Sequence, residues 1–121
     1  FKNSPGGLLI HPNLHTLPPG PHGFHLHQNA SCGKNGLAAG GHLDPKKTST
    51  HLGPYKTGHL GDLPVLYVNA EGKSLTTLIA PHLSLDDIKG HSIMIHAGGD
   101  NYTDNPTLGG GGPRIACGVI R

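Results

Sequence analysis

Turn-forming residues interrupt this chain at short intervals, and no other feature limits its fold as strongly. The 20 glycines and 11 prolines make up about a quarter of the 121 residues, and the apolar runs between them are only a few residues long. Runs of that length, bounded by turn residues, are typical of β-strands in an all-β protein. The charged fraction is 13%, which is low for a disordered chain. The sequence therefore predicts a folded, turn-rich β protein.

The apolar runs predict a specific order of elements. We expect strands at residues 7–14, 22–28, 63–69, 74–80, 92–96 and 115–120. One short helix is expected at Leu83–Lys89, where Ser84 is the N-cap, Asp87 completes a capping box and Gly90 ends the helix. Residues 29–61 and 98–112 lack periodicity and are expected to form two long functional loops.

The Leu63–Ala80 segment is expected to be a hairpin that is apolar on both faces. A sheet with one solvent-exposed face would alternate more clearly between apolar and polar residues. Two explanations remain open. The hairpin forms the interface of a homodimer, or it is a strand pair buried inside the domain.

Length and charge exclude several classes of protein. A chain of 121 residues suits a single domain, residues 1–121. The net charge is +2 and the basic residues are scattered, so nothing indicates the basic stripe of a nucleic-acid-binding protein. No apolar run approaches the roughly 18 residues of a membrane span.

Histidines point to metal binding. On a strand, His25 and His27 project from the same face and form a chelating pair. Five further candidate ligands follow in the chain: His42, His51, His59, Asp62 and His96. Three imidazoles with one carboxylate suit tetrahedral zinc, and an imidazole-only set suits copper or zinc. Seven ligands are too many for one tetrahedral ion, so we expect two adjacent metals.

The two cysteines lie 85 positions apart and form no CxxC motif. Spacing alone leaves two readings open. Cys32 and Cys117 are buried free thiols in a reducing compartment, or they form one disulfide in an oxidising compartment.

Seven ordered stretches together resemble the copper–zinc superoxide dismutases, and among these the bacterial periplasmic branch. They are residues 23–27, 40–45, 51–55, 58–64, 91–96, 98–102 and 109–120. The resemblance implies an eight-stranded Greek-key β-barrel or sandwich (immunoglobulin-like). It also implies an enzyme that converts superoxide to dioxygen and hydrogen peroxide. Copper would change oxidation state while zinc shares a bridging histidine with it.

The resemblance assigns roles to individual residues. It implies a copper site of His25, His27, His42 and His96, and a zinc site of His42, His51, His59 and Asp62. His42 would bridge the two metals and handle a proton. Asp100 would link His25 to His51 behind the ligands, Arg114 would attract the superoxide anion beside copper, and Cys32 and Cys117 would form the intrachain disulfide.

Other implications concern the setting of the protein. This chain starts near the third strand of the family pattern, so the N-terminal hairpin is expected to be missing. A periplasmic location is expected, reached through a signal peptide that is not in this chain. His82 is a candidate extra ligand to a metal or to haem near a dimer surface. The alternative function is a periplasmic copper- and zinc-binding module of the same fold without dismutase activity.

Overall fold

The computed structural model describes all of residues 1–121, and its regular elements are mostly short strands joined by turns and loops. The strands are β1 Lys2–Ser4, β2 Gly7–Ile10, β3 Gly20–His22, β4 Phe24–His27, β5 Leu66–Val68, β6 Leu78–Ala80, β7 Ser92–His96 and β8 Arg114–Val119. Helical segments are the α-helix α1 Leu85–Ile88 and the 3-10 turns η1 Leu37–Ala39 and η2 Thr107–Gly110. None of these is long and apolar enough to cross a membrane.

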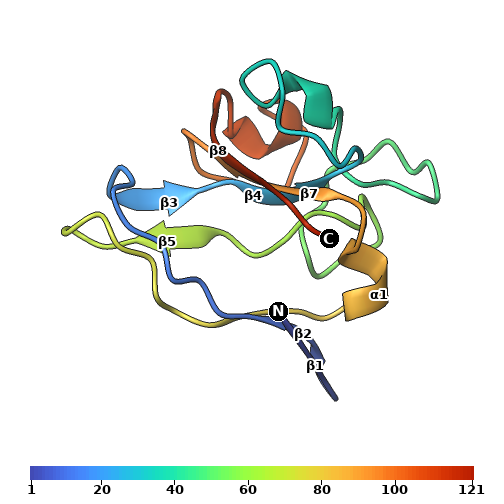
Figure 1. Ribbon diagram of the computed structural model, residues 1–121. Coiled ribbons are helices and arrows are strands. Elements are labelled where there is room, and N and C mark those ends of the chain that lie inside the picture. The colour runs from blue at the N-terminus through green and yellow to red at the C-terminus, as the bar shows by residue number, and fades with distance from the viewer.

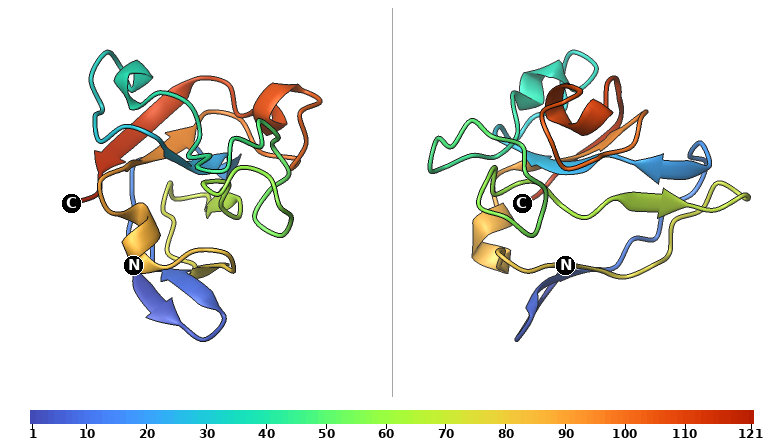
Figure 2. Two further views of the ribbon diagram at one scale, coloured as in Figure 1. Left: turned by 90° about the vertical axis from the view of Figure 1, so that its right-hand side faces the viewer. Right: turned by 180° about the vertical axis from the view of Figure 1, so that it is seen from behind.

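The strands pair into three small sheets with antiparallel neighbours. Their orders are β1-β2-β6, β3-β5 and β4-β7-β8. The β4-β7-β8 sheet and the β1-β2-β6 sheet form opposite layers, and α1 lies at one side between them (Figures 1 and 2). The loops that carry η1 and η2 cover the outer face of the β4-β7-β8 sheet (Figure 1). This is the all-β architecture with two long loops and one short helix that the sequence predicts.

The apolar core lies between the layers and consists of small aliphatic side chains with one phenylalanine. Its buried members are Leu8, Ile10, Phe24, Leu26, Leu43, Leu63, Leu66, Ala80, Leu83, Ile88 and Ile95. Burial of side chains of this size supplies about 1.5–3 kcal/mol each. The core therefore fixes β4, whose Phe24 and Leu26 face inward, and leaves His25 and His27 on the opposite face under the loops.

The predicted Leu63–Ala80 hairpin is wrong as a strand pair. A tight turn does form where it was expected, since the Asn69 N–H donates to the Lys73 carbonyl at 2.8 Å. However, β5 on one side of that turn pairs with β3, and β6 on the other side pairs with β2. The two arms separate into different sheets because each finds a partner that is distant in sequence.

Three further details differ from the expectation. The strand expected at residues 22–28 begins earlier, at Gly20, and is divided at Gly23 into β3 and β4. The strand expected at residues 7–14 stops at Ile10, and an additional strand, β1, precedes it. The helix is shorter than predicted, but its capping box is confirmed: the Asp87 carboxylate accepts the Ser84 backbone N–H at 2.8 Å.

Candidate metal centre

The outer edge of β4 positions most of the candidate ligands. β7 occupies one edge of β4, and the other edge is occupied by the two ends of the long loop. Leu26 donates its N–H to Gly61 at 2.8 Å and accepts the Leu43 N–H at 2.8 Å. These bonds place His42 opposite His27, and Asp62 opposite His25, as isolated bridges. Backbone pairing therefore brings loop ligands beside the strand-borne histidines.

The first cluster contains imidazoles only: His25, His27, His42 and His96. One nitrogen from each lies within 4.8 Å of the others, and all four residues are buried. The His27 and His96 Nε2 atoms are 3.4 Å apart. His96 reaches this position at the end of β7, where a bulge interrupts the pairing with β8.

The outward nitrogens of three of these rings are held by the protein. His27 Nδ1–H donates to the Gly40 carbonyl at 2.8 Å and His96 Nδ1–H donates to the Gly112 carbonyl at 3.0 Å, while His25 Nε2 contacts the Asp100 carboxylate at 2.7 Å. Each N–H on the outer side leaves the inner nitrogen with a lone pair. Burial lowers the pKa of His25 to about 4 and that of His27 to about 3, which keeps both rings neutral.

The second cluster adds a carboxylate. Asp62 Oδ1 lies 2.8 Å from His42 Nδ1, and Asp62 Oδ2 lies 2.9 Å from His51 Nδ1 and 3.3 Å from His59 Nδ1. Burial alone would raise the pKa of Asp62, but the three imidazoles hold it well below its usual range. One ligand atom each from His25, His42, His51 and Asp62 lies within 4.8 Å of the others, and His59 is outside this group.

Both clusters fit metal ions by an independent observation. His25 Nδ1, His42 Nε2, His51 Nδ1, His59 Nδ1 and Asp62 Oδ2 are buried without a partner in hydrogen-bond geometry. Such atoms are costly to bury unless something coordinates them. The two carboxylates also make the site favour positive charge. Although burial lowers the pKa of His51, contact with Asp100 and Asp62 raises it to about 9. The imidazole-only set suits copper, and the set with the carboxylate suits zinc.

Asp100 connects the two clusters from behind. Its Oδ2 contacts His25 Nε2 at 2.7 Å, and its Oδ1 contacts His51 Nε2 at 2.8 Å. Burial would raise the pKa of Asp100, but these imidazoles and the Tyr102 backbone N–H hold it well below its usual range. The carboxylate is therefore charged and fixes the orientation of one ring in each cluster.

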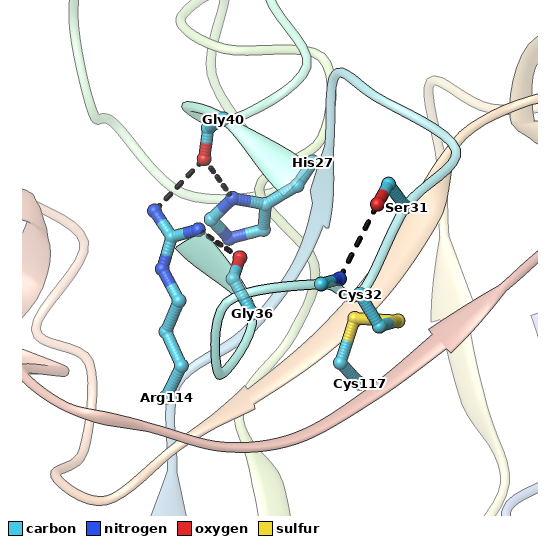
Figure 3. Close-up of a disulfide and its surroundings, with 8 residues drawn as sticks. His27, Ser31, Cys32, Gly36, Gly40, Arg114 and Cys117 are labelled. Atoms are coloured by element: carbon cyan, nitrogen blue, oxygen red, sulfur yellow. Dashed lines mark hydrogen bonds between the residues drawn. A yellow bond between two sulfur atoms is a disulfide. The ribbon is translucent and has the colours of Figure 1, made fainter. Parts of the chain in front are cut away.

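Arg114 lies beside the imidazole-only cluster, and the loop that follows Cys32 holds its side chain. Its guanidinium donates to the Gly36 carbonyl at 2.7 Å and to the Gly40 carbonyl at 2.8 Å (Figure 3). The predicted disulfide is confirmed, with the Cα atoms of Cys32 and Cys117 5.8 Å apart. It joins β8, which carries Arg114, to the loop that supplies both carbonyls. The Gly40 carbonyl accepts from Arg114 and from His27 together.

Some predicted residues lie elsewhere, and some contributors were missed. His82 is exposed and belongs to neither cluster. Asp104 was not predicted, yet its Oδ2 accepts the His51 backbone N–H at 2.9 Å. The carbonyls of Gly36 and Gly40 were also missed. Every residue has a carbonyl, so only the three-dimensional structure distinguishes these two.

Comparisons with known proteins agree on one family. The family model for copper/zinc superoxide dismutase (SODC) matches residues 1–120. A superoxide dismutase [Cu-Zn] of Legionella pneumophila is 58% identical over 121 residues, which are 100% of this chain and 75% of the relative. The Cu/Zn superoxide dismutase structure from Brucella abortus has a TM-score of 0.94 at 55% identity, over 99% of this chain and 84% of that chain. The monomeric enzyme from Salmonella enterica gives a TM-score of 0.83 at 54% identity, with the same coverage.

Proposed function

This chain belongs to the copper/zinc superoxide dismutase family. We propose that one of its two histidine clusters binds copper and the other binds zinc. The protein is an oxidoreductase that converts superoxide to dioxygen and hydrogen peroxide, with copper and zinc as cofactors. The observation that carries the division is the set of buried, unpartnered ligand atoms on either side of His42.

The first part of the proposal assigns ligands. The copper ligands are His25, His27, His42 and His96, and the zinc ligands are His42, His51, His59 and Asp62. When bound, copper supplies the redox chemistry, accepting an electron from one superoxide and giving it to the next. The support for the first set is that every ring presents a nitrogen to the others, while the remaining nitrogens of His25, His27 and His96 are anchored outside.

His42 is the proposed proton carrier. Its two ring nitrogens face opposite clusters: Nδ1 lies 2.8 Å from Asp62 Oδ1, and Nε2 is buried without a partner beside the imidazole-only cluster. Formation of hydrogen peroxide from superoxide requires two protons. When it is not bound to copper, His42 Nε2 would take a proton from solvent and deliver it to the nascent peroxide, and solvent would supply the other. Asp62 holds the His42 ring in place while Nε2 gains and loses a proton.

Arg114 is the proposed anchor for the anion. Its side chain is fixed by the Gly36 and Gly40 carbonyls, so its positive charge stays beside His27 without a large entropic cost on substrate arrival. No carboxylate pairs with this guanidinium. Fixed positive charge near a buried site raises the encounter rate of a small anion and makes that rate sensitive to salt.

The rival function, a metal-binding module without dismutase activity, is not favoured. The relatives that match this chain at 55–58% identity are named superoxide dismutases. A binding module would also have no use for a cation that is held beside the copper cluster and left unpaired.

The decisive experiment combines metal analysis with a superoxide-decay assay. We expect two metals per chain and decay that is lost on copper removal and restored by copper. Arg114→Ala should slow decay about tenfold or more and flatten its salt dependence while copper content stays constant. Arg121→Ala, which removes the same charge from the exposed C-terminus, is the matched control. Equal kinetics in the two variants would refute the role of Arg114, and zinc-only protein without activity would refute the ligand assignment.

We further propose a homodimer that uses the Leu63–Ala80 segment. Three of its apolar side chains are exposed: Tyr67 at 65%, Leu75 at 58% and Ile79 at 46%. Analytical ultracentrifugation should show a dimer that Tyr67→Lys dissociates. Sedimentation of the unmodified protein as a monomer, the state of the Salmonella enterica relative, would refute it.

Two proposals concern the setting of the protein. We propose a periplasmic location because the Cys32–Cys117 disulfide requires an oxidising compartment. Recovery of the natural protein with free thiols in the cytoplasmic fraction would contradict it.

We also propose His82 as a haem ligand, since its ring is exposed and has no hydrogen-bond partner in the chain. A haem titration whose Soret change is the same in His82→Ala would exclude this role.

A further inference from the structure

A cavity of about 320 Å³ lies beside the proposed zinc cluster. Arg114 is not among its lining residues. Loop residues 44–46, 53–54, 56–60 and 62 line it together with residues 80 and 82–83. Two of the proposed zinc ligands, His59 and Asp62, are among the lining residues, whereas no copper-only ligand is. The cavity therefore borders the zinc cluster but not the copper-only ligands.

His59 differs from the other ligand histidines in its outward nitrogen. The corresponding atoms of His25 and His51 contact Asp100, and those of His27 and His96 donate to backbone carbonyls. His59 Nε2 has no hydrogen-bond partner anywhere in the chain, and it is not among the unpartnered atoms sealed from solvent. Its side chain is 10% exposed, while that of Asp62 is 0% exposed.

The missing partner has a defined chemistry. Histidines that bind a metal through one nitrogen almost always donate the other N–H to an acceptor, which fixes the ring. Once Nδ1 of His59 faces zinc, Nε2 carries the proton and requires such an acceptor. The chain supplies none, so the acceptor must come from the cavity.

The charges of the cavity favour an anion as that acceptor. Lys46 and Lys56 line it and form no salt bridge. The one carboxylate there besides the ligand Asp62 is Asp44, whose oxygens accept from Thr48 and Ser49, so the two lysines outnumber it. Two lysines without a salt bridge and an unpartnered N–H donor thus line one small space.

We propose that this cavity binds a small oxyanion of the phosphate class, which accepts the His59 Nε2–H and pairs with Lys46 and Lys56. The bound anion holds the His59 ring in the orientation that zinc needs, and so slows the loss of zinc. This inference rests on the proposed function, because it takes His59 Nδ1 to be a zinc ligand.

The test uses the fully metallated enzyme with inorganic phosphate as the probe. Zinc release to a chromogenic chelator is followed at constant ionic strength, with sodium chloride replaced stepwise by sodium phosphate. We expect phosphate to slow release about tenfold at saturation, the lower end of what outer partners of ligand histidines contribute. The Lys46→Gln/Lys56→Gln variant should lose this protection. Lys2→Gln/Lys73→Gln, which removes two exposed charges away from the cavity, should keep it.

A second measurement reports on the ring itself. In the reduced, diamagnetic enzyme, the His59 Nε2–H proton resonance should shift on phosphate addition, with the same midpoint as the change in release rate. Equal phosphate responses in the two double variants, no response, or faster release would overturn the proposal and leave water as the partner of His59. Zinc content is measured first: a His59→Ala enzyme that retains zinc as tightly as the unmodified one would refute the ligand assignment instead.

Discussion

Replacement of Gly109 by alanine should detach Asp100 from the metal centre. Gly109 lies in η2 with φ of +76°, and a Cβ built there would overlap Asp100 Oδ1 and lie 2.9 Å from His51 Nε2. That oxygen already contacts His51 Nε2 and the Tyr102 N–H, each at 2.8 Å. The carboxylate has to move, and its 2.7 Å contact with His25 is lost with it.

The expected cost has two parts that a control can separate. A positive φ costs any L-residue about 1–2 kcal/mol. Gly112 has φ of +66° and nothing within 4 Å of its built Cβ, so Gly112→Ala carries the backbone strain without the clash. Removal of the carboxylate that orients two ligand histidines typically weakens metal affinity 10- to 100-fold, or about 1.4–2.8 kcal/mol. Only Gly109→Ala should show this second part.

Zinc affinity, measured by competition with a chromogenic chelator, distinguishes the two variants. We expect Gly109→Ala to bind zinc about 10- to 100-fold more weakly than Gly112→Ala. Equal zinc affinities in the two alanine variants would refute the argument that Asp100 holds the ligands, because the clash is with Asp100 itself.

Two other predictions concern stability. Cys32→Ser/Cys117→Ser should lower the free energy of unfolding by at most about 4–5 kcal/mol, measured in urea, since the disulfide closes a loop of 85 residues; a change under 1 kcal/mol would contradict it. The metal-free protein should be most stable near pH 6.5. Below that, the unfolded chain binds protons that the buried rings of His25 and His27, with pKa values lowered to about 4 and 3, do not bind. Above it, the contribution of His51, whose pKa Asp100 and Asp62 raise to about 9 against the opposing effect of burial, is lost as the pH rises. Urea unfolding from pH 4 to 9 that showed stability still rising above pH 7 would contradict this reasoning.

The gathering of these histidines could be predicted from the sequence because several of them sit in local patterns. His25 and His27 share a strand face at i and i+2 spacing, and β4 places both under the loops. His96 ends a run of strand-forming residues, and β7 has the bounds expected for it. The pairing of Cys32 with Cys117 follows from the resemblance and not from the spacing, which allowed free thiols equally.

Contacts made by the backbone and pairings between distant strands were not predictable in this way. The turn at Asn69–Lys73 is encoded locally, and it favours a hairpin in any reading of the sequence. Nothing local shows that β5 will instead pair with β3 and β6 with β2. Gly109 is a similar case. Within a run of four glycines, only the approach of Asp100 shows which one cannot carry a side chain.

Assembly of the two histidine clusters depends on docking of the long loop against β4. β4 has only β7 as a regular partner, and its other edge is satisfied by bonds from Leu43 and Gly61. The residues that follow or precede these contacts are His42 and Asp62, so the loop cannot leave the strand without dismantling both clusters. Because a buried strand edge is costly when unpaired, the core itself drives the loop into place. Metal binding then adds its free energy to the same docked state, which is why ligand loss should destabilise the loop before it affects the core.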